Sequence, residues 1–177
     1  MTVRKFENFA PRIAATAYVD ETALVIGNVS IADDVSLWPQ VVVRGDIHSI
    51  EIGARTNIQD GSVLHVSHDS EFAPGGFALR IGADITVGHR AILHGCTVED
   101  RCLIGMAATV MDGAIVRSGA IVGAGSLVPP GRELDGGYLW VGSPARKVRP
   151  LREHESAFLE YSAAHYTELK NRHLAAR

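Results

Sequence analysis

Residues 98–128, VEDRCLIGMAATVMDGAIVRSGAIVGAGSLV, repeat a six-residue pattern without interruption. An aliphatic residue returns at every sixth position, and a small residue often follows four positions later. A period of six fits neither the helical turn nor the simple alternation of a flat strand. It is typical of short strands separated by tight corners, with the aliphatic side chain pointing into a narrow core. The aliphatics of this run are Val98, Ile104, Val110, Val116, Val122 and Val128.

The same spacing extends upstream through most of the chain. Chance spacing in an aliphatic-rich chain is the alternative, and eighteen aliphatics in near-register argue against it. Three repeats per coil predict an all-β fold, a triangular parallel β-solenoid stabilised by stacking of neighbouring coils. The upstream aliphatics are Ile13, Val19, Val25, Ile31, Leu37 and Val43, then Ile52, Ile58 and Leu64, then Ile81, Val87 and Leu93.

Length and composition predict one domain over residues 1–177. Hydrophobic residues make up 46% and charged residues 21%, which suggests neither disorder nor a membrane span. The net charge of −3 argues against nucleic acid as a partner. The N-terminus lacks the apolar core of a secretion signal, and two cysteines are too few for a disulfide framework. We therefore expect a cytoplasmic protein that binds neither nucleic acid nor membranes.

Three irregularities interrupt the repeat, and all three flank histidines. Three extra residues lie between Val43 and Ile52, a long excursion with Pro74 separates Leu64 from Ile81, and one residue is missing after Leu93. Insertions in solenoids commonly gather on a functional face. We assign residues 10–130 to the β-helix, 131–150 to a proline- and glycine-rich exit segment, and 151–175 to a C-terminal helix.

The predicted helix has an apolar face. Phe158, Tyr161, His165 and Leu169 recur at helical spacing. We expect this face to pack against the solenoid or against a neighbouring subunit.

The repeat places two histidines in one column. His65 follows the aliphatic that begins the third face of its coil, and His94 occupies the same place one coil later. This indexing holds if the long loop replaces only a corner. Neighbouring strands lie about 4.8 Å apart, and tetrahedral zinc with bonds of ~2.0–2.1 Å needs ligand nitrogens about 3.3 Å apart. Two stacked imidazoles can therefore converge on one metal ion.

A third histidine, His89, falls on a different face. Within one chain it should not readily reach the other two, whereas around a threefold axis it can meet them from a neighbour. The spacing thus predicts a homotrimer with metal sites shared between subunits. The same indexing places Arg44 in the column of His65 and Asp60 below His89, so an Arg44–Asp60 pair between subunits is a second expectation. The alternative for these two charges is an ordinary surface pair.

The repeat over residues 10–130 resembles the hexapeptide repeat of left-handed parallel β-helix proteins. With RGD at 44–46, NIQDGSVLH at 57–65 and VGHRAILHGC at 87–96, the chain resembles the γ-class carbonic anhydrase-like family. More narrowly it is similar to the bacterial branch often labelled carbonic anhydrase-like or ferripyochelin-binding. The resemblance implies that zinc, or Fe²⁺ or Co²⁺, is bound by His65, His89 and His94. It also implies that Asn57 and Gln59 line the pocket, and that Arg44, Asp46 and Asp60 support the interface.

Three neutral imidazoles leave zinc an open position, as in catalytic sites, and the resemblance implies that the reaction is the reversible hydration of CO₂ to bicarbonate. Proton release needs a shuttle, and here the sequence departs from the family pattern. Glutamates expected just after RGD and three residues after the first ligand are replaced by Ile47 and His68. A histidine can shuttle protons near neutral pH, so His68 is a candidate, and an exposed loop residue is the alternative.

Two other functions remain open. A hexapeptide-repeat acyltransferase that uses acyl-CoA would share the solenoid and the GSPARKVRP segment, but it needs one basic histidine rather than three in metal register. A non-catalytic trimer that binds a metal or a partner would share the histidines. Metal content separates the first alternative, and CO₂ hydration by the metal-loaded protein separates the second.

Overall fold

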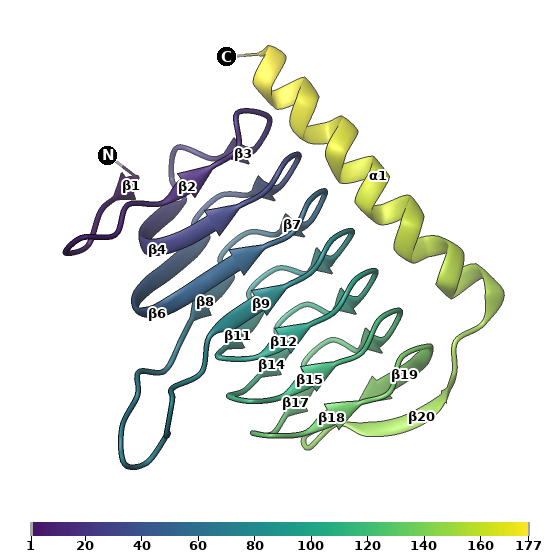
Figure 1. The fold of residues 1–177 in the computed structure, drawn as a ribbon. Coiled ribbons are helices and arrows are strands. Elements are labelled where there is room, and N and C mark those ends of the chain that lie inside the picture. Colours follow the sequence, from purple (N-terminus) through teal and green to yellow (C-terminus); the bar gives the residue numbers. More distant parts are fainter. Residues whose placement is uncertain (1, 177) are drawn as a thin grey trace.

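The computed structural model describes residues 2–176, in which short parallel strands stack into a triangular solenoid with a helix along one side (Figure 1). The predicted left-handed parallel β-helix with a C-terminal α-helix is confirmed. Two sheets account for the three faces.

One sheet forms a single face, which we call the helix face because α1 (Glu153–Ala175) covers it. Its strands pair in parallel from β3 to β19, and β20 then turns back antiparallel to β19. The strands are β3 (Tyr18–Val19), β5 (Ser36–Leu37), β7 (Asn57–Ile58), β10 (Thr86–Val87), β13 (Leu103–Ile104), β16 (Ile121–Val122), β19 (Tyr138–Val141) and β20 (Arg146–Pro150).

The other sheet wraps round a corner and forms the two remaining faces. Its long strands β4 (Leu24–Ile31) and β6 (Val42–Ile52) cross that corner, so β6 pairs with β8 at its start and with β9 at its end. The histidine face holds β8 (Val63–His65), β11 (Ile92–His94), β14 (Thr109–Val110) and β17 (Leu127–Val128). The third face holds β9 (Leu79–Ile81), β12 (Thr97–Val98), β15 (Ile115–Val116) and β18 (Glu133–Leu134), while β1 (Val3–Arg4) and β2 (Arg12–Ile13) pair with β4.

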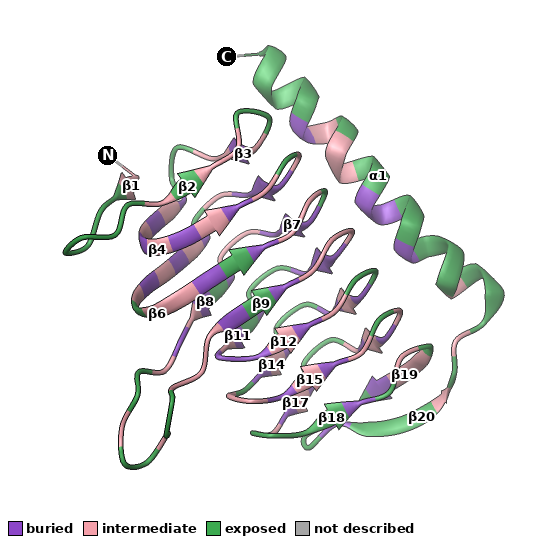
Figure 2. Ribbon diagram, in the orientation of Figure 1, coloured by how far each residue is buried: buried purple, intermediate pink, exposed green. Residues whose placement is uncertain are grey.

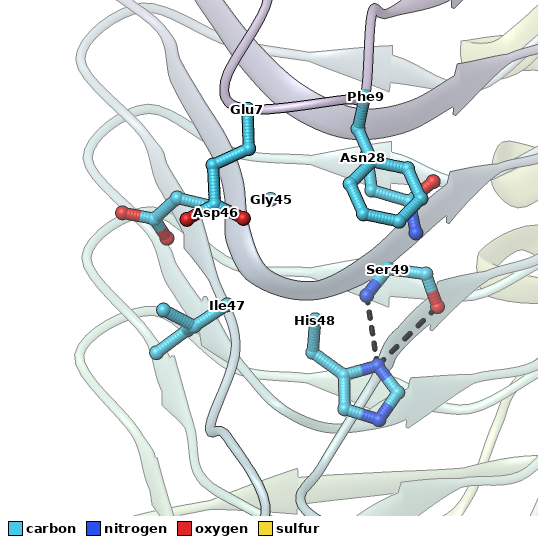
Figure 3. Close-up of a pocket in the computed structure, with 8 residues that line it drawn as sticks. All are labelled: Glu7, Phe9, Asn28, Gly45, Asp46, Ile47, His48 and Ser49. Carbon is cyan, nitrogen blue, oxygen red and sulfur yellow. Dashed lines mark hydrogen bonds between the residues drawn. The ribbon is translucent and has the colours of Figure 1, made fainter.

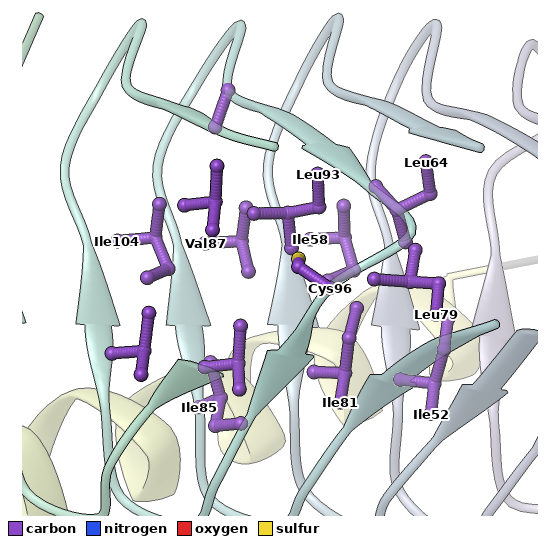
Figure 4. Packing of buried hydrophobic residues seen from close by; sticks show 14 of the residues in the cluster. Ile52, Ile58, Leu64, Leu79, Ile81, Ile85, Val87, Leu93, Cys96 and Ile104 are labelled. Atoms are coloured by element: carbon purple, nitrogen blue, oxygen red, sulfur yellow. The ribbon is translucent and has the colours of Figure 1, made fainter. Parts of the chain in front are cut away.

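The core is a stack of aliphatic side chains inside the solenoid (Figure 4), and buried residues recur along its strands (Figure 2). Leu64 stacks on Leu93 of the next coil, and Ile58 stacks on Val87, as the repeat predicts. The small residues that recur before each strand are also buried, because the narrow interior leaves room for little more than a methyl group at those corners. They include Ala91, Ala108, Ala114 and Ala120.

The coils extend beyond residues 10–130. Leu134 and Trp140 keep the six-residue spacing after Val128, point inward and stack on Val116 and Val122. Part of the predicted exit segment therefore continues the solenoid, and β20 ends it.

Tight corners require left-handed backbone conformations, and not only glycine supplies them. Asp34, Arg55, Asp84 and Arg101 follow one another along the corner between the third face and the helix face, all with φ between 55° and 59°. Their charges alternate, and Arg55 binds both carboxylate oxygens of Asp84 at 2.6 and 2.7 Å. This pairing offsets part of the strain that a side chain brings to such a conformation.

The helix docks with a different face from the one that its apolar spacing indicated. Leu159, Ser162 and Ala163 are buried against the solenoid, whereas Phe158 and Tyr161 are 48% and 62% exposed. Small residues allow the helix to approach the sheet closely, so packing selects them over the aromatic stripe. The expectation that the Phe158–Tyr161 face covers the solenoid is therefore wrong for a single chain.

A buried lysine fixes the far end of the helix. Lys170 Nζ lies 2.7 Å from Asp34 Oδ1 and donates a hydrogen bond of 2.8 Å to the carbonyl oxygen of Thr16. Its side chain is 2% exposed, so the charge is compensated by partners from the first coils. Across residues 2–176, no helix has both the length and the apolar composition to cross a membrane.

Candidate metal centre

His65 and His94 lie side by side at the ends of β8 and β11, in the register that the repeat predicts. Their rings are tilted by 59°, and His65 Nδ1 lies 3.0 Å from His94 Nε2. This separation is close to the spacing of two nitrogens on one tetrahedral zinc ion, about 3.3 Å. The strands therefore bring two potential ligands to a common point.

Carboxylates hold the opposite nitrogens of both rings. His65 Nε2 lies 3.1 Å from Asp46 Oδ1, and His94 Nδ1 lies 2.6 Å from Asp112 Oδ1. A neutral imidazole that donates its one N–H to a carboxylate presents a lone pair at the other nitrogen. With both rings neutral and in these tautomers, the two nitrogens that face each other across 3.0 Å would both present lone pairs, an arrangement suited to a cation between them.

A proton is a poor candidate for that cation. Burial lowers the pKa of His65, and Arg44 and His94 lower it further, although the hydrogen bond to Asp46 opposes the change. Burial opposes ionisation of Asp46 as well, but hydrogen bonds from Arg44 and His65 hold its pKa below the usual value. A neutral imidazole beside an ionised carboxylate is the pairing found around protein-bound zinc. The residues present therefore fit a divalent metal.

His89 stands apart from this pair, at the corner that follows β10. Its Nδ1 lies 2.9 Å from Asp60 Oδ2, and its side chain is 46% exposed. Thus all three histidines share one feature, a carboxylate on one ring nitrogen. Among the described residues of one chain, no three His, Cys, Asp or Glu side chains converge on a metal position.

Polar side chains of the helix face form a buried chain of hydrogen bonds close to His89. Gln59 Nε2 donates to Asn57 Oδ1 at 3.2 Å, and Asn57 Nδ2 donates to Thr86 Oγ1 at 2.9 Å. Thr86 meets Ser162 of α1 at 2.7 Å, so the helix completes the network. Because its amide nitrogen is engaged, Gln59 keeps its carbonyl oxygen as an acceptor.

Gln59 and His89 line a pocket between this face and the helix. The pocket has a volume of about 400 Å³, and most of its wall is apolar, with Leu103, Met106 and Tyr166 among the lining residues. A metal ion near His89 would therefore border a largely apolar space.

A second cleft, of about 410 Å³, opens beside Asp46 under the N-terminal segment (Figure 3). Ile47, at the place where the resemblance expects glutamate, lines it and is 44% exposed. His48 lies across the cleft and accepts a hydrogen bond from the backbone N–H of Ser49 at 2.8 Å. Asp46 both lines this cleft and contacts His65.

The remaining predicted residues are placed as follows. Arg44 donates to Asp46 Oδ2 at 2.7 Å, which makes Asp46 a bridge between Arg44 and His65. Asp60 lies below His89 as expected. His68 is exposed on the hairpin after β8, where no hydrogen bond or ion pair joins it to the three histidines within residues 2–176.

Asp112 was missed by sequence reasoning, although the repeat contained a signal for it. It follows Val110 by two places, in the column of Gly95, directly beside His94. A side chain at position 95 would collide with the Asp112 carboxylate, so the glycine makes room for it. The signal is an acidic residue in the coil after a candidate ligand, stacked on a glycine that directly follows that ligand.

Known proteins resemble this chain along nearly its full length. No family model matches. The chain is 51% identical to Escherichia coli YrdA over 97% of this chain and 94% of that protein. It is 39% identical to a carbonic anhydrase of Geobacillus kaustophilus over 92% of this chain and 86% of that protein. It is 42% identical to mitochondrial γ-carbonic anhydrase 1 of Arabidopsis thaliana over 94% of this chain, which spans 60% of that relative.

Solved structures agree on the fold. A hexapeptide transferase family protein from Anaplasma phagocytophilum superposes with a TM-score of 0.88 at 36% identity, over 96% of each chain. A Bacillus cereus protein described as an acetyltransferase superposes with a TM-score of 0.92 at 31% identity, over 99% of this chain and 98% of that one.

The fold and the three carboxylate-bound histidines define a hexapeptide-repeat β-helix protein with a candidate metal centre. The relatives make the class narrower: the chain belongs to the γ-class carbonic anhydrase-like family.

Proposed function

We propose that the protein is a zinc-dependent carbonic anhydrase that hydrates CO₂ reversibly at sites shared between the subunits of a homotrimer. One observation carries the proposal: the facing nitrogens of His65 and His94, 3.0 Å apart, with a carboxylate on the far side of each ring. The carbonic anhydrase names of the relatives support the reaction. A cytoplasmic location and the choice of zinc over iron or cobalt are parts of the same proposal.

The shared site follows from the placement of His89. His65 and His94 supply two ligands from the histidine face of one copy, and His89 of a neighbour supplies the third. The outward residues beside the pair support an interface there, because Val63 and Ile92 are apolar and 38% and 41% exposed. Arg44 and Asp60, both partly exposed, would then face each other across the same interface.

Zinc held by the three histidines would lower the pKa of a coordinated water to about 7 and would so supply a nucleophile for CO₂ at neutral pH. The chain's own residues orient and shield this site. Gln59, whose amide nitrogen is held by Asn57, offers its carbonyl oxygen as a hydrogen-bond acceptor to the solvent molecule. Asp46, Asp60 and Asp112 fix the ring orientation and tautomer of the three histidines. His68, exposed on the hairpin, would be the residue available to pass the proton to bulk water.

The test combines metal analysis with stopped-flow CO₂ hydration on the reduced, zinc-loaded protein. We expect one zinc ion per chain and a zinc-dependent rate well above that of buffer. A fully loaded trimer whose rate equals that of buffer would leave a metal-binding protein and remove the enzymatic function.

Subunit mixing tests the sharing of ligands directly. His89→Ala and the double variant His65→Ala/His94→Ala should each bind no zinc at the site. In randomly mixed trimers, an intact site forms wherever a His89→Ala chain meets a neighbour that keeps His89, which occurs at about one quarter of the interfaces in an equimolar mixture. Mixed trimers that recover no zinc would refute the shared site.

Acyl transfer is the second candidate, favoured by the names of the two structural neighbours. The three carboxylate-bound histidines speak for the metal function, since an acyltransferase needs one base. A metal-free trimer that consumes acyl-CoA in the presence of an acceptor would reverse the choice.

A further inference from the structure

The hairpin between β8 and β9 displays an aromatic side chain to solvent. Phe72, near its tip, is 90% exposed, the largest exposed fraction among the large hydrophobic residues of the described chain. Holding a bare phenyl ring in water forgoes the free energy that its burial would contribute. On an ordered segment, such a side chain is available for contact with another molecule.

The hairpin is ordered by its own hydrogen bonds. Ser67 and Phe77 exchange backbone hydrogen bonds of 3.1 and 2.9 Å, and Ser70 and Ala73 exchange a second pair. The Asp69 carboxylate accepts from the backbone N–H of Gly75 at 2.7 Å and closes the tip. Phe72 is therefore presented on a defined scaffold.

The base of the hairpin is tied to the metal centre. Ser67 Oγ donates to Asp112 Oδ2 at 2.9 Å, and the other oxygen of Asp112 holds His94. Phe77 packs over Gly95 and Gly113, where an added Cβ would meet the Cβ of Phe77 at position 95 and its ring at position 113. The hairpin thus leaves the solenoid at the half-site of His65 and His94, in a fixed direction.

The matching cavity lies on the other half of the proposed site. The pocket of about 400 Å³ beside α1 is bordered by His89 and lined by Leu103, Met106, Phe158 and Tyr166. If His89 of a neighbour completes the site of this chain, that neighbour's pocket borders the shared site, and this chain's hairpin leaves the solenoid from the same site. Six residues lie between His65 and Phe72, and at about 3.3 Å per residue this length of chain is sufficient to extend beyond another ligand of the same metal ion.

Charge also fits a second copy. Glu71, beside Phe72, and Arg90, beside His89, are both exposed. They would approach each other when the hairpin of one copy lies along the neighbour's pocket.

We infer that in the trimer each hairpin reaches the neighbouring copy and inserts Phe72 into the apolar pocket between its helix α1 and its helix face. This inference rests on the proposed function, because it uses the shared site to place the two copies. It assigns the exposed Phe158 side of the helix to a subunit interface, and it makes the hairpin a wall of the metal site that the two copies share.

Cross-linking within the full-length protein tests the contact. The variant Phe72→Cys/Met106→Cys places thiols on the hairpin and on the rim of the pocket, where Met106 is 59% exposed. Cys96 and Cys102 are buried and their pKa values are raised to about 12, so they should not compete. The control is Phe72→Cys/Val148→Cys, since Val148 is 52% exposed on the last strand.

A short bis-maleimide should convert the first variant into covalent dimers and trimers on a denaturing gel and leave the control monomeric. Monomers from both variants, with an intact zinc-loaded trimer by sedimentation, would overturn the hairpin contact and leave the proposed function standing. A protein that is monomeric before cross-linking would overturn both.

A second variant measures the contribution of the aromatic ring. Phe72→Ala should raise the concentration at which trimers dissociate by about tenfold or more, because each interface loses a buried aromatic side chain. Phe6→Ala, which removes a phenyl ring that is 40% exposed on the N-terminal segment, should leave it within about twofold. Equal effects of the two variants would contradict the inference.

Discussion

The coils that carry the histidines and the coils that follow them share one core but differ at their corners. From Val98 to Leu134 the strands are two residues long and the corners are tight turns. Between Val42 and His94 one strand runs for 11 residues and a hairpin replaces a corner. The pairing of β4 with β6 shifts at the insertion in β6, but the histidine face keeps its register, since β8 pairs with β11 and β11 with β14. The repeat sets the position of each side chain, and the insertions add polar side chains beside the histidines while the stacking of the histidine face is kept.

Replacing a proposed metal ligand in the histidine coils should have the largest effect of all, on zinc binding and on CO₂ hydration. His94→Ala should abolish zinc binding and zinc-dependent CO₂ hydration, because it removes one of two converging nitrogens. Met111→Ala changes the residue that lies one coil above His94 and should retain zinc. Metal analysis and stopped-flow rates check both, and zinc retained by His94→Ala would disprove the centre.

The shared core should respond equally in both regions. Leu93 and Ile104 are both fully buried, one in a histidine coil and one in a regular coil. Leu93→Ala and Ile104→Ala should each lower the free energy of unfolding by about 2–5 kcal/mol. Denaturant titration at a fixed protein concentration measures both values. A clearly smaller loss at Leu93 would show that the insertions weaken the core beneath them.

For zinc affinity, the carboxylates that contact the histidines should matter less than the proposed ligands but more than other surface carboxylates. Asp112→Asn keeps the size of the side chain and removes the charge that orients His94, so zinc affinity should fall about 10- to 100-fold. Glu99→Gln, which breaks an ion pair with Arg117 in a regular coil, should leave zinc affinity unchanged. Competition with a chromogenic chelator gives the affinities, and an equal loss for both variants would remove the special role of Asp112.

Acid should produce the smallest effect, at the start of the helix. The Arg149 guanidinium lowers the pKa of Glu155 to about 2. A pKa below its unfolded value means that Glu155 stabilises the folded state above pH 4.5, and that this contribution is lost as the pH falls towards 2. Hydrogen exchange in the first turn of α1 should therefore increase over this range. Glu155→Gln should abolish the pH dependence, and Glu153→Gln, which removes a charge from the same turn, should retain it.

The parts of the molecule that sequence predicted are those that the repeat controls. A period of six sets strand register, so the His65–His94 pair and the Asp60–His89 pair could be placed from spacing alone. Helix docking follows a different rule, because apolar spacing shows a stripe without naming its partner. Ser162 and Ala163 pack against the solenoid because they are small, whereas Phe158 and Tyr161 of the aromatic stripe remain exposed.

The helix also changes how the two ends of the solenoid are stabilised. A stack of repeats is nearly one-dimensional, and its terminal coils have neighbours on one side only, so such stacks can fray from their ends. Here the helix leaves the last coil and returns to the first, where Lys170 binds Asp34 and Thr16. Opening either end means lifting the same helix. The stack is thereby joined into a closed circuit, in which the two ends of the chain hold each other in place.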